Sequence, residues 1–314
     1  MKLISCTLLA VSALAQRPTN PALLVPQDAP PLDIAAMVQP LVLPAGRSMG
    51  APASVGFDSQ HHIFILNRGP QALAEFDAQG QFIRLFGDGL LKRAHGLTID
   101  KADNIWVTDV EAHVVMKLNQ QGKVLLTLGT AGEAGEWNEA TGSHHFDQPT
   151  SVALGRNGDV FVAQGHNPAG GDARVLKFDA GGKFIKSWGG RGSEPGKFTT
   201  AHGIAIDAQG LVWVADRENQ RIQVFDQDGK LVREMKYAGL PSSISIGERY
   251  IYMVNGYAGQ LVRMDLSGKV LAAVGKSGKG PGEFGEAHEV TEGPNGDVWV
   301  ADTVNSAVQK FVMK

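Results

Sequence analysis

Three histidines recur at one position of an internal repeat, and imidazoles in such a pattern can bind a metal ion. They are His95 in AHGLTID, His202 in AHGIAID and His288 in AHEVTEG. Aligning all copies of the repeat on the residue that ends their first apolar run gives one shared column. That column reads Ala53, His95, Thr150, His202, Ser242 and His288. Three neutral imidazoles that leave a fourth position open are a common ligand set of catalytic zinc.

The repeat that carries the histidines predicts a six-bladed β-propeller. Clear copies begin at Ala94, Ala201 and Ala287, and weaker copies begin at Pro52, Pro149 and Pro241. Each copy reads as four strands rich in Val, Ile, Phe and Trp, separated by turn residues. Six copies of a four-stranded unit, each about 40–55 residues long, are typical of an all-β propeller. No stretch shows sustained helical periodicity.

The ends of the repeat array predict how the ring closes. The last copy stops at FVMK after its third strand, and residues 36–43, AMVQPLVL, read as a strand. We expect this N-terminal strand to complete the last blade, which removes two exposed edges. Because the first strand of each blade is the innermost, the three histidines should face the central channel and converge. The alternative is that each histidine is a separate channel-lining residue.

Two arginines are expected on the same face as the histidines. The loop after the second strand of each copy gives the column Arg68, Val110, Gly165, Arg217, Gly256 and Thr303. Arg68 and Arg217 therefore lie on opposite sides of the channel mouth and suit a carboxylate-bearing ligand. The alternative is pairing with a local acid such as Glu218 or Asp216. The next position holds His166 and Tyr257, which are candidate general bases, although Tyr257 can also be a packing residue.

The remaining features bound the class of protein. The 314 residues carry a net charge of −3, so charge gives no reason to expect nucleic acid or a membrane surface as partner. Residues 1–16, MKLISCTLLAVSALAQ, have the layout of a signal peptide and are too short for a membrane span. Residues 17–35 are proline-rich and expected to be a flexible lead-in to a propeller at 36–314. We expect an exported monomer, periplasmic or extracellular, without disulfides because Cys6 is the only cysteine.

Several stretches resemble a known family. They are HGLTIDKADNIWVTDVEAHVVMKL, FDQPTSVAL, GKFIKSWG, PGKFTTAHGIAID and VWVADRENQRIQVF. On these stretches residues 50–314 resemble the NHL-repeat propellers, and among them the peptidyl-α-hydroxyglycine α-amidating lyases, also called peptidylamidoglycolate lyases. The resemblance implies cleavage of a peptide carbinolamide, R–CO–NH–CH(OH)–COO⁻, to a primary amide and glyoxylate. It makes His95, His202 and His288 the zinc ligands and Arg68 and Arg217 the active-site arginines.

The resemblance also implies a structural calcium ion in the channel. The ion would be held by the backbone carbonyls of Val55 and Leu97 and by the side chain of Glu289, where the family has an aspartate.

Two further positions depart from the family. The family places a tyrosine after Asp-Gly in the third blade, but here His166 follows Gln164 and Gly165. Either His166 or Tyr257 would then act as the base. A family methionine two residues before the third histidine is Glu286 here.

Two other functions remain open. One is a non-catalytic NHL propeller that binds a peptide or protein on its top face. The other is a calcium-dependent lactonase, but such sites use acids and asparagine, and the histidine column contains no acid.

Overall fold

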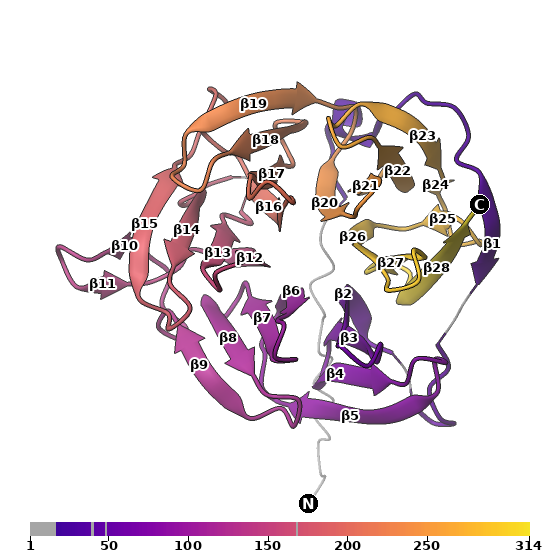
Figure 1. The fold of residues 1–314 in the computed structure, drawn as a ribbon, viewed down its shortest axis with the longest axis horizontal. Coiled ribbons are helices and arrows are strands. Elements are labelled where there is room, and N and C mark those ends of the chain that lie inside the picture. The colour runs from indigo at the N-terminus through magenta and orange to yellow at the C-terminus, as the bar shows by residue number, and fades with distance from the viewer. Residues whose placement is uncertain (1–16, 39–40, 48, 168) are drawn as a thin grey trace, which may run out of the picture.

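The computed structural model describes residues 17–38, 41–47, 49–167 and 169–314, and these form a ring of six four-stranded antiparallel blades (Figure 1). The blades, each from its innermost to its outermost strand, are as follows. Blade one is β2 (Ala51–Phe57), β3 (Ile63–Arg68), β4 (Gln71–Phe76) and β5 (Phe82–Asp88); blade two is β6 (Ala94–Ile99), β7 (Ile105–Asp109), β8 (Val114–Leu118) and β9 (Val124–Leu128); blade three is β12 (Pro149–Leu154), β13 (Val160–Gln164), β14 (Arg174–Phe178) and β15 (Phe184–Gly189). Blade four is β16 (Ala201–Ile206), β17 (Val212–Asp216), β18 (Arg221–Phe225) and β19 (Leu231–Lys236); blade five is β20 (Pro241–Ile246), β21 (Ile251–Asn255), β22 (Gln260–Met264) and β23 (Val270–Val274); blade six is β26 (Ala287–Glu292), β27 (Val298–Asp302), β28 (Ala307–Met313) and β1 (Ile34–Val38). The predicted fold class is therefore confirmed.

The ring closes through its N-terminal strand, as predicted. β1 pairs antiparallel with β28, which places an N-terminal strand at the outer edge of the last blade (Figure 1). The strand ends earlier than expected, because residues 41–43 are not in a strand and residues 39–40 lie outside the described part of the chain.

Four short strands and one short helix lie outside the blades. A small hairpin, β10 (Trp137–Asn138) with β11 (Ser143–His144), projects from the ring between blades two and three (Figure 1). β24 (Lys276–Ser277) pairs parallel with β25 (Glu283–Phe284), and η1 (Pro21–Leu24) is a 3₁₀ turn. No helix in the described ranges is long and apolar enough to cross a membrane.

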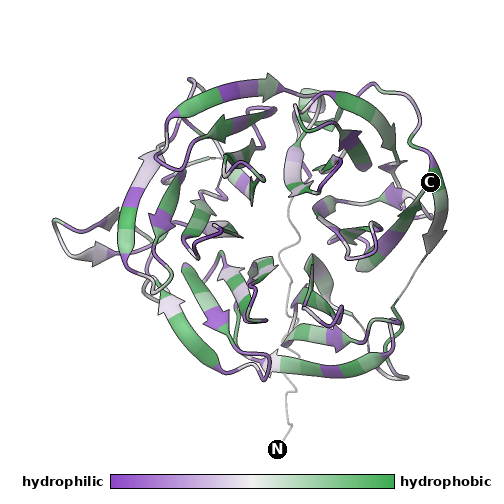
Figure 2. Cartoon of the chain, viewed as in Figure 1, coloured by the Kyte–Doolittle hydropathy of each residue, from purple (hydrophilic) through white to green (hydrophobic). Residues whose placement is uncertain are grey.

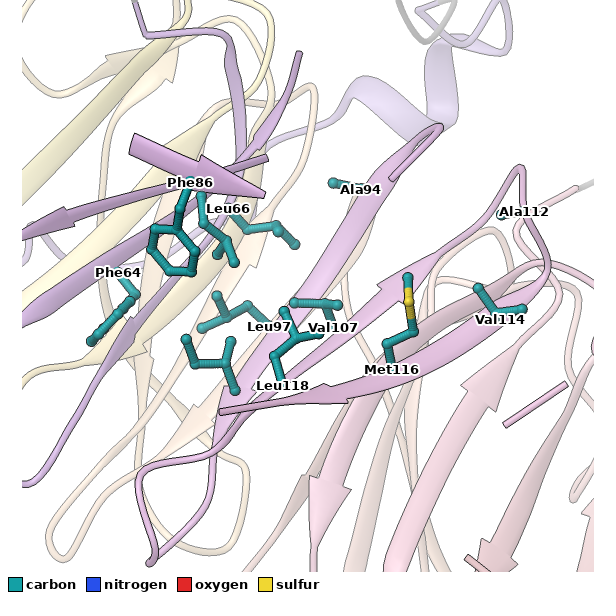
Figure 3. Close-up of a cluster of buried hydrophobic side chains, with 12 residues drawn as sticks. Phe64, Leu66, Phe86, Ala94, Leu97, Val107, Ala112, Val114, Met116 and Leu118 are labelled. Carbon is teal, nitrogen blue, oxygen red and sulfur yellow. The ribbon is translucent and has the colours of Figure 1, made fainter. Parts of the chain in front are cut away.

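The core is divided among the seams between neighbouring blades. In one such seam Phe64 and Leu66 of blade one pack with Leu97 and Val107 of blade two (Figure 3). Figure 2 shows apolar residues along most of the strands. Successive residues of one strand point into opposite seams, since Ile63 and Ile65 pack toward blade six while Phe64 and Leu66 pack toward blade two, so each blade is apolar on both sides. The second strand of each blade also contributes one buried aromatic residue at the same repeat position. These residues are Phe64, Trp106, Phe161, Trp213, Tyr252 and Trp299. This repeated packing fixes the inner strands, which carry the histidine column.

The segment expected to be a flexible lead-in contacts blade five. Leu32 donates its backbone N–H to the carbonyl of Ala273 (2.8 Å), and Ala273 donates to the carbonyl of Pro30 (2.9 Å). Nearer the histidine face, the Gln27 backbone N–H donates to the side chain of Gln260 (2.7 Å). The chain therefore runs along blade five before β1 joins blade six.

Candidate metal centre

A β-bulge turns the histidine column toward the axis. In all six blades the pairing of the first two strands shifts register at this column, for example between Ala201 and Gly203 and between Ala287 and Glu289. An extra residue in one strand leaves the ladder and re-aims its side chain. The bulge explains why a residue on an otherwise regular inner strand can point into the channel.

The three histidines meet, as the repeat column predicted. Their candidate ligand atoms all lie within 4.8 Å of one another. The ring centroids of His95 and His202 are 4.6 Å apart, those of His95 and His288 are 4.6 Å apart, and those of His202 and His288 are 5.1 Å apart. Each side chain is almost completely buried. The three side chains are therefore close enough to share one ligand sphere.

Backbone carbonyls of the intervening blades fix the tautomer of each ring. His95 Nδ1 lies 2.8 Å from the Thr150 carbonyl, His202 Nδ1 lies 2.8 Å from the Ser242 carbonyl, and His288 Nδ1 lies 2.8 Å from the Ala53 carbonyl. A carbonyl oxygen only accepts, so each Nδ1 must donate, and Nε2 of the neutral ring carries no proton. The small residues of the column thus supply the acceptors that orient the histidines.

The inward nitrogens have the properties of metal ligands. Nε2 of His95 and of His202 is buried and has no hydrogen-bond partner among the described residues. The third, Nε2 of His288, accepts a hydrogen bond from Arg68 Nη2 at 2.9 Å. Burial lowers the pKa of all three imidazoles well below the ordinary value, and the neighbouring histidines and arginines lower it further. Neutral imidazoles whose lone pairs are oriented, two of them without a hydrogen-bond donor among the described residues, fit a bound cation.

Glycines allow the carbonyls to approach the rings. A β-carbon at Gly96 would lie 2.5 Å from the carbonyl oxygen of Thr150, and one at Gly203 would lie 2.8 Å from that of Ser242. These are the carbonyls that accept from His95 and His202, so the residue after each of these two histidines must be glycine. The third histidine is followed by Glu289 instead, which places a carboxyl group beside the site.

An aspartate at the end of the second strand fixes the chain before each histidine, and our sequence analysis missed it. Asp109 accepts from the backbone of Lys92 (2.5 Å) and Arg93 (3.1 Å). Asp216 accepts from Thr199 (2.9 Å) in the same way. In blade six Asp302 accepts from Gly285 (2.9 Å) and Glu286 (3.0 Å). A signal was available, because this column reads Asn67, Asp109, Gln164, Asp216, Asn255 and Asp302 and places an aspartate only in the histidine-bearing blades.

The two predicted arginines reach the site but differ in their partners. Arg68 Nη2 contacts His288, and Arg68 Nε donates to the Ala94 carbonyl at 3.1 Å. Arg217 is buried and pairs with Glu218, through Nε at 2.9 Å and Nη2 at 2.8 Å. The pairing of Arg217 with a local acid, one of the two readings of the sequence, is thus present.

His166 lies against the rings of His95 and His202. Its ring centroid is 4.7 Å from that of His95 and 5.5 Å from that of His202. Burial lowers its pKa well below the ordinary value, with further lowering by the charges of His95 and Arg217, so the ring is neutral. Its position is set by Gly165, whose φ of +108° and close approach to Ala173 require glycine.

Tyr257 and Glu286 form a second buried group beside Arg217. Tyr257 hydrogen-bonds to Glu286, and burial together with this carboxylate raises the pKa of the phenol. Burial raises the pKa of Glu286, while the charges of Arg217 and Arg68 lower it. Glu286 Oε1 lies 4.0 Å from Arg217 Nη1, and its Oε2 is buried without a hydrogen-bond partner in the described ranges. The site thus contains Glu286 at the position where the resembled family has a methionine.

The three residues implied for calcium lie beyond the histidine plane. Val55, Leu97 and Glu289 all line a cavity of about 670 Å³ in the opposite half of the channel. Thr291 donates to the Val55 carbonyl at 2.7 Å. Burial raises the pKa of Glu289 to about 8, and a hydrogen bond from Ser54 lowers it in part. The structure therefore brings these residues to one channel.

Fold and site together define the class of protein. The chain is a six-bladed NHL propeller with a three-histidine candidate metal centre on its axis, and residues 198–225 match the NHL repeat family.

Similar proteins narrow this class. Peptidyl-glycine α-amidating monooxygenase of Mus musculus is 33% identical over 255 residues, which cover 75% of this chain and 25% of that protein. A probable peptidyl-α-hydroxyglycine α-amidating lyase of Caenorhabditis elegans is 38% identical over 159 residues, covering 49% of this chain and 43% of that protein. The resemblance to the amidating lyases is confirmed, although the chain spans between a quarter and about half of these relatives.

Among solved structures, a streptogramin B lyase has a TM-score of 0.63 at 16% identity, covering 89% of this chain and 98% of that one, which supports the fold alone.

Proposed function

We propose that the protein is a zinc-dependent lyase that cleaves the C–N bond of peptidyl-α-hydroxyglycine or a related carbinolamide. The observation that carries the proposal is the set of three inward Nε2 atoms. Each belongs to a ring that a backbone carbonyl of the neighbouring blade orients through Nδ1. The probable amidating lyase at 38% identity and the amidating monooxygenase at 33% identity support the same chemistry.

The donor set suits zinc. Three neutral imidazoles with an open fourth position match catalytic zinc, whereas calcium and magnesium prefer oxygen ligands. When bound, Zn²⁺ supplies a Lewis acid that lowers the pKa of a substrate hydroxyl group. We propose the oxygen ligands Val55, Leu97 and Glu289 as a separate structural calcium site.

His166 is the base that this geometry favours. Its neutral ring contacts His95 and can take the proton of the substrate hydroxyl group. The electron pair of the former O–H bond then forms the aldehyde carbonyl, the C–N bond breaks, and the nitrogen takes the hydroxyl proton from His166. The products are a primary amide and glyoxylate, so atoms and charge balance. Tyr257 is less suited as the base because its raised pKa keeps the phenol protonated, so that it cannot accept a proton, and its hydroxyl group is hydrogen-bonded to Glu286.

Positively charged side chains would bind the substrate carboxylate. Arg68 lies 2.9 Å from the inward nitrogen of His288, so its guanidinium group is beside the reacting centre. Arg217 contributes positive charge from the other side of the channel, held by Glu218. Such fixed charges orient the scissile bond and stabilise charge that develops during cleavage.

The test is a product assay on purified, zinc-loaded protein. N-Benzoyl-α-hydroxyglycine would be the substrate, and benzamide and glyoxylate would both be quantified above spontaneous breakdown. We expect equal amounts of the two products, loss of activity after chelation and its recovery with Zn²⁺. The His95→Ala variant should show no activity. His61→Ala, which removes an exposed histidine far from the column, is the matched control.

Absence of both products with zinc-loaded wild-type protein would overturn the proposal and favour a peptide-binding propeller. Export and a monomeric state stay predictions. The predicted signal peptide lies outside the described residues.

A further inference from the structure

The charges around the candidate metal centre are unevenly matched. Arg217 has two acidic neighbours, Glu218 at 2.8 Å and Glu286 at 4.0 Å, and all three side chains are largely buried. Because Glu218 already accepts from the Nε and Nη2 donors of its guanidinium group, Arg217 has limited capacity to bind a further carboxylate.

Arg68 has no acid within ion-pair distance among the described residues. Its hydrogen-bond partners are the Ala94 carbonyl and His288 Nε2, both uncharged. Burial lowers the pKa of Arg68 to about 10, with Glu286 opposing and the charge of Arg93 lowering it further. The His288 nitrogen is also the atom that a metal would use, which would free Arg68 Nη2 for a ligand.

Arg93 is a third arginine at this site, and the repeat columns did not include it. It lies two residues before His95, and its backbone N–H is held by Asp109 at 3.1 Å. Both oxygens of Asp109 accept backbone N–H groups, from Lys92 on one side and from Arg93, Glu111 and Ala112 on the other. The carboxylate that holds the Arg93 backbone is therefore already occupied by backbone donors.

The guanidinium group of Arg93 makes no hydrogen bond or ion pair with the described residues. Its Nε is buried without a hydrogen bond in the described ranges. Its positive charge lowers the pKa of Arg68, His166 and His288, which places the group near all three. A buried donor without an acceptor is costly, and two neighbouring cations without an acid between them favour an anion.

We propose that Arg93, together with Arg68, forms the seat for the substrate carboxylate, while Arg217 is a positioning residue whose charge is matched by Glu218 and Glu286. This inference rests on the proposed function and names a binding residue for it. Arg93 and Arg68 come from neighbouring blades, and Arg68 Nε bonds to Ala94, the residue next to Arg93. The seat therefore lies at the seam of blades one and two, beside His95 and His288.

Equilibrium binding tests the inference without turnover. The probes are N-benzoylglycine, which lacks the hydroxyl group and is not cleaved, and its uncharged amide. For zinc-loaded Arg93→Gln we expect N-benzoylglycine to bind about 10- to 100-fold more weakly by calorimetry, as for loss of a hydrogen-bonded charge. Binding of the amide should change less than about twofold. Arg217→Gln should reduce the preference for the carboxylate much less.

The controls separate binding from folding. Arg93→Met keeps the apolar stem and removes the charge, so it should reproduce the effect of Arg93→Gln if either variant folds with wild-type zinc content. Arg233→Gln removes an arginine that stacks on Trp213, away from the histidines, and should change nothing. An unchanged preference for the carboxylate in a folded Arg93 variant overturns the inference.

Turnover distinguishes this inference from the function on which it rests. Failure of wild-type protein to release glyoxylate rejects the lyase. If the wild-type protein releases glyoxylate and Arg93→Gln has the same KM as wild type, only the carboxylate-binding role of Arg93 is rejected.

Discussion

Replacing Asp109 with asparagine should weaken both the fold and the metal centre. Asp109 is 0% exposed and accepts four backbone N–H bonds, at 2.5 Å from Lys92, 3.1 Å from Arg93, 3.0 Å from Glu111 and 2.8 Å from Ala112. An asparagine keeps one acceptor and turns an N–H group toward at least one donor. With the charge assistance also lost, the expected cost is about 2–4 kcal/mol of unfolding free energy.

The same change should displace His95. The bonds from Asp109 hold the chain two and three residues before this histidine, so their loss frees the strand that aims its ring. Loss of such orienting contacts typically weakens metal binding by about 10- to 100-fold. The assays are urea unfolding of the metal-free protein and a competition titration of Zn²⁺ against a chromophoric chelator.

A matched control lies at the other end of the same hairpin. Asp100 accepts backbone N–H groups of Ala102 (2.9 Å) and Asn104 (2.9 Å) in the turn between β6 and β7. Asp100→Asn should lower stability and leave zinc affinity unchanged. An Asp109→Asn protein with wild-type zinc affinity, or an equal loss of affinity in Asp100→Asn, would refute the reasoning.

Three further outcomes follow from the site. His166→Gln should lower kcat by about 100-fold or more at unchanged zinc content, whereas Tyr257→Phe should change it by less than about fivefold; a larger effect in Tyr257→Phe would reassign the base. Burial raises the pKa of Glu289 to about 8 from an ordinary 4.5. In metal-free protein the contribution of this protonated carboxyl group to stability is present below pH 4.5 and is lost as the pH rises through 8. Urea titrations should therefore show wild-type stability falling relative to Glu289→Gln across this window by up to about 5 kcal/mol, and parallel pH profiles would contradict the assignment. Gly165→Ala should cost about 1–3 kcal/mol of stability and reduce kcat, since φ is +108° and a β-carbon would lie 2.6 Å from its nearest neighbour. Gly142→Ala, with φ of +70° and nothing within 4 Å, should cost less and leave kcat unchanged; equal effects in both variants would argue against crowding.

The repeat explains why much of the fold was predictable. Each copy carries its own strand pattern and turns, so the number of blades and the closing strand follow from the sequence. The inner position of the first strand then brings His95, His202 and His288 together from far apart in the chain. Other columns alternate between blades in the same way. The aspartate column has Asp only in the histidine-bearing blades, and the aromatic column of the second strands has tryptophan only in those blades, as Trp106, Trp213 and Trp299. The pair of blades is therefore the unit that builds the site.

Details that depend on side-chain conformation were not predictable. Several acids lie within reach of Arg217, and only the folded geometry shows that Glu218 pairs with it. Arg93 precedes the histidine column in a segment without a repeat signal, so its approach to the site was not visible in the sequence. The same is true of residues 30–32, which pair with Ala273 without any strand pattern of their own. The bulge that aims the histidines is likewise a property of the paired strands rather than of one strand.

The central claim is that three histidines from alternate blades bind one metal ion. Elemental analysis of the purified protein tests it most directly, with His95→Ala, His202→Ala and His288→Ala beside wild type and His61→Ala as control. We expect close to one zinc ion per chain in wild type and in His61→Ala. Each of the three column variants should lose most of its zinc. Zinc absent from wild-type protein grown and purified with zinc present, or retained in all three column variants, would contradict the account.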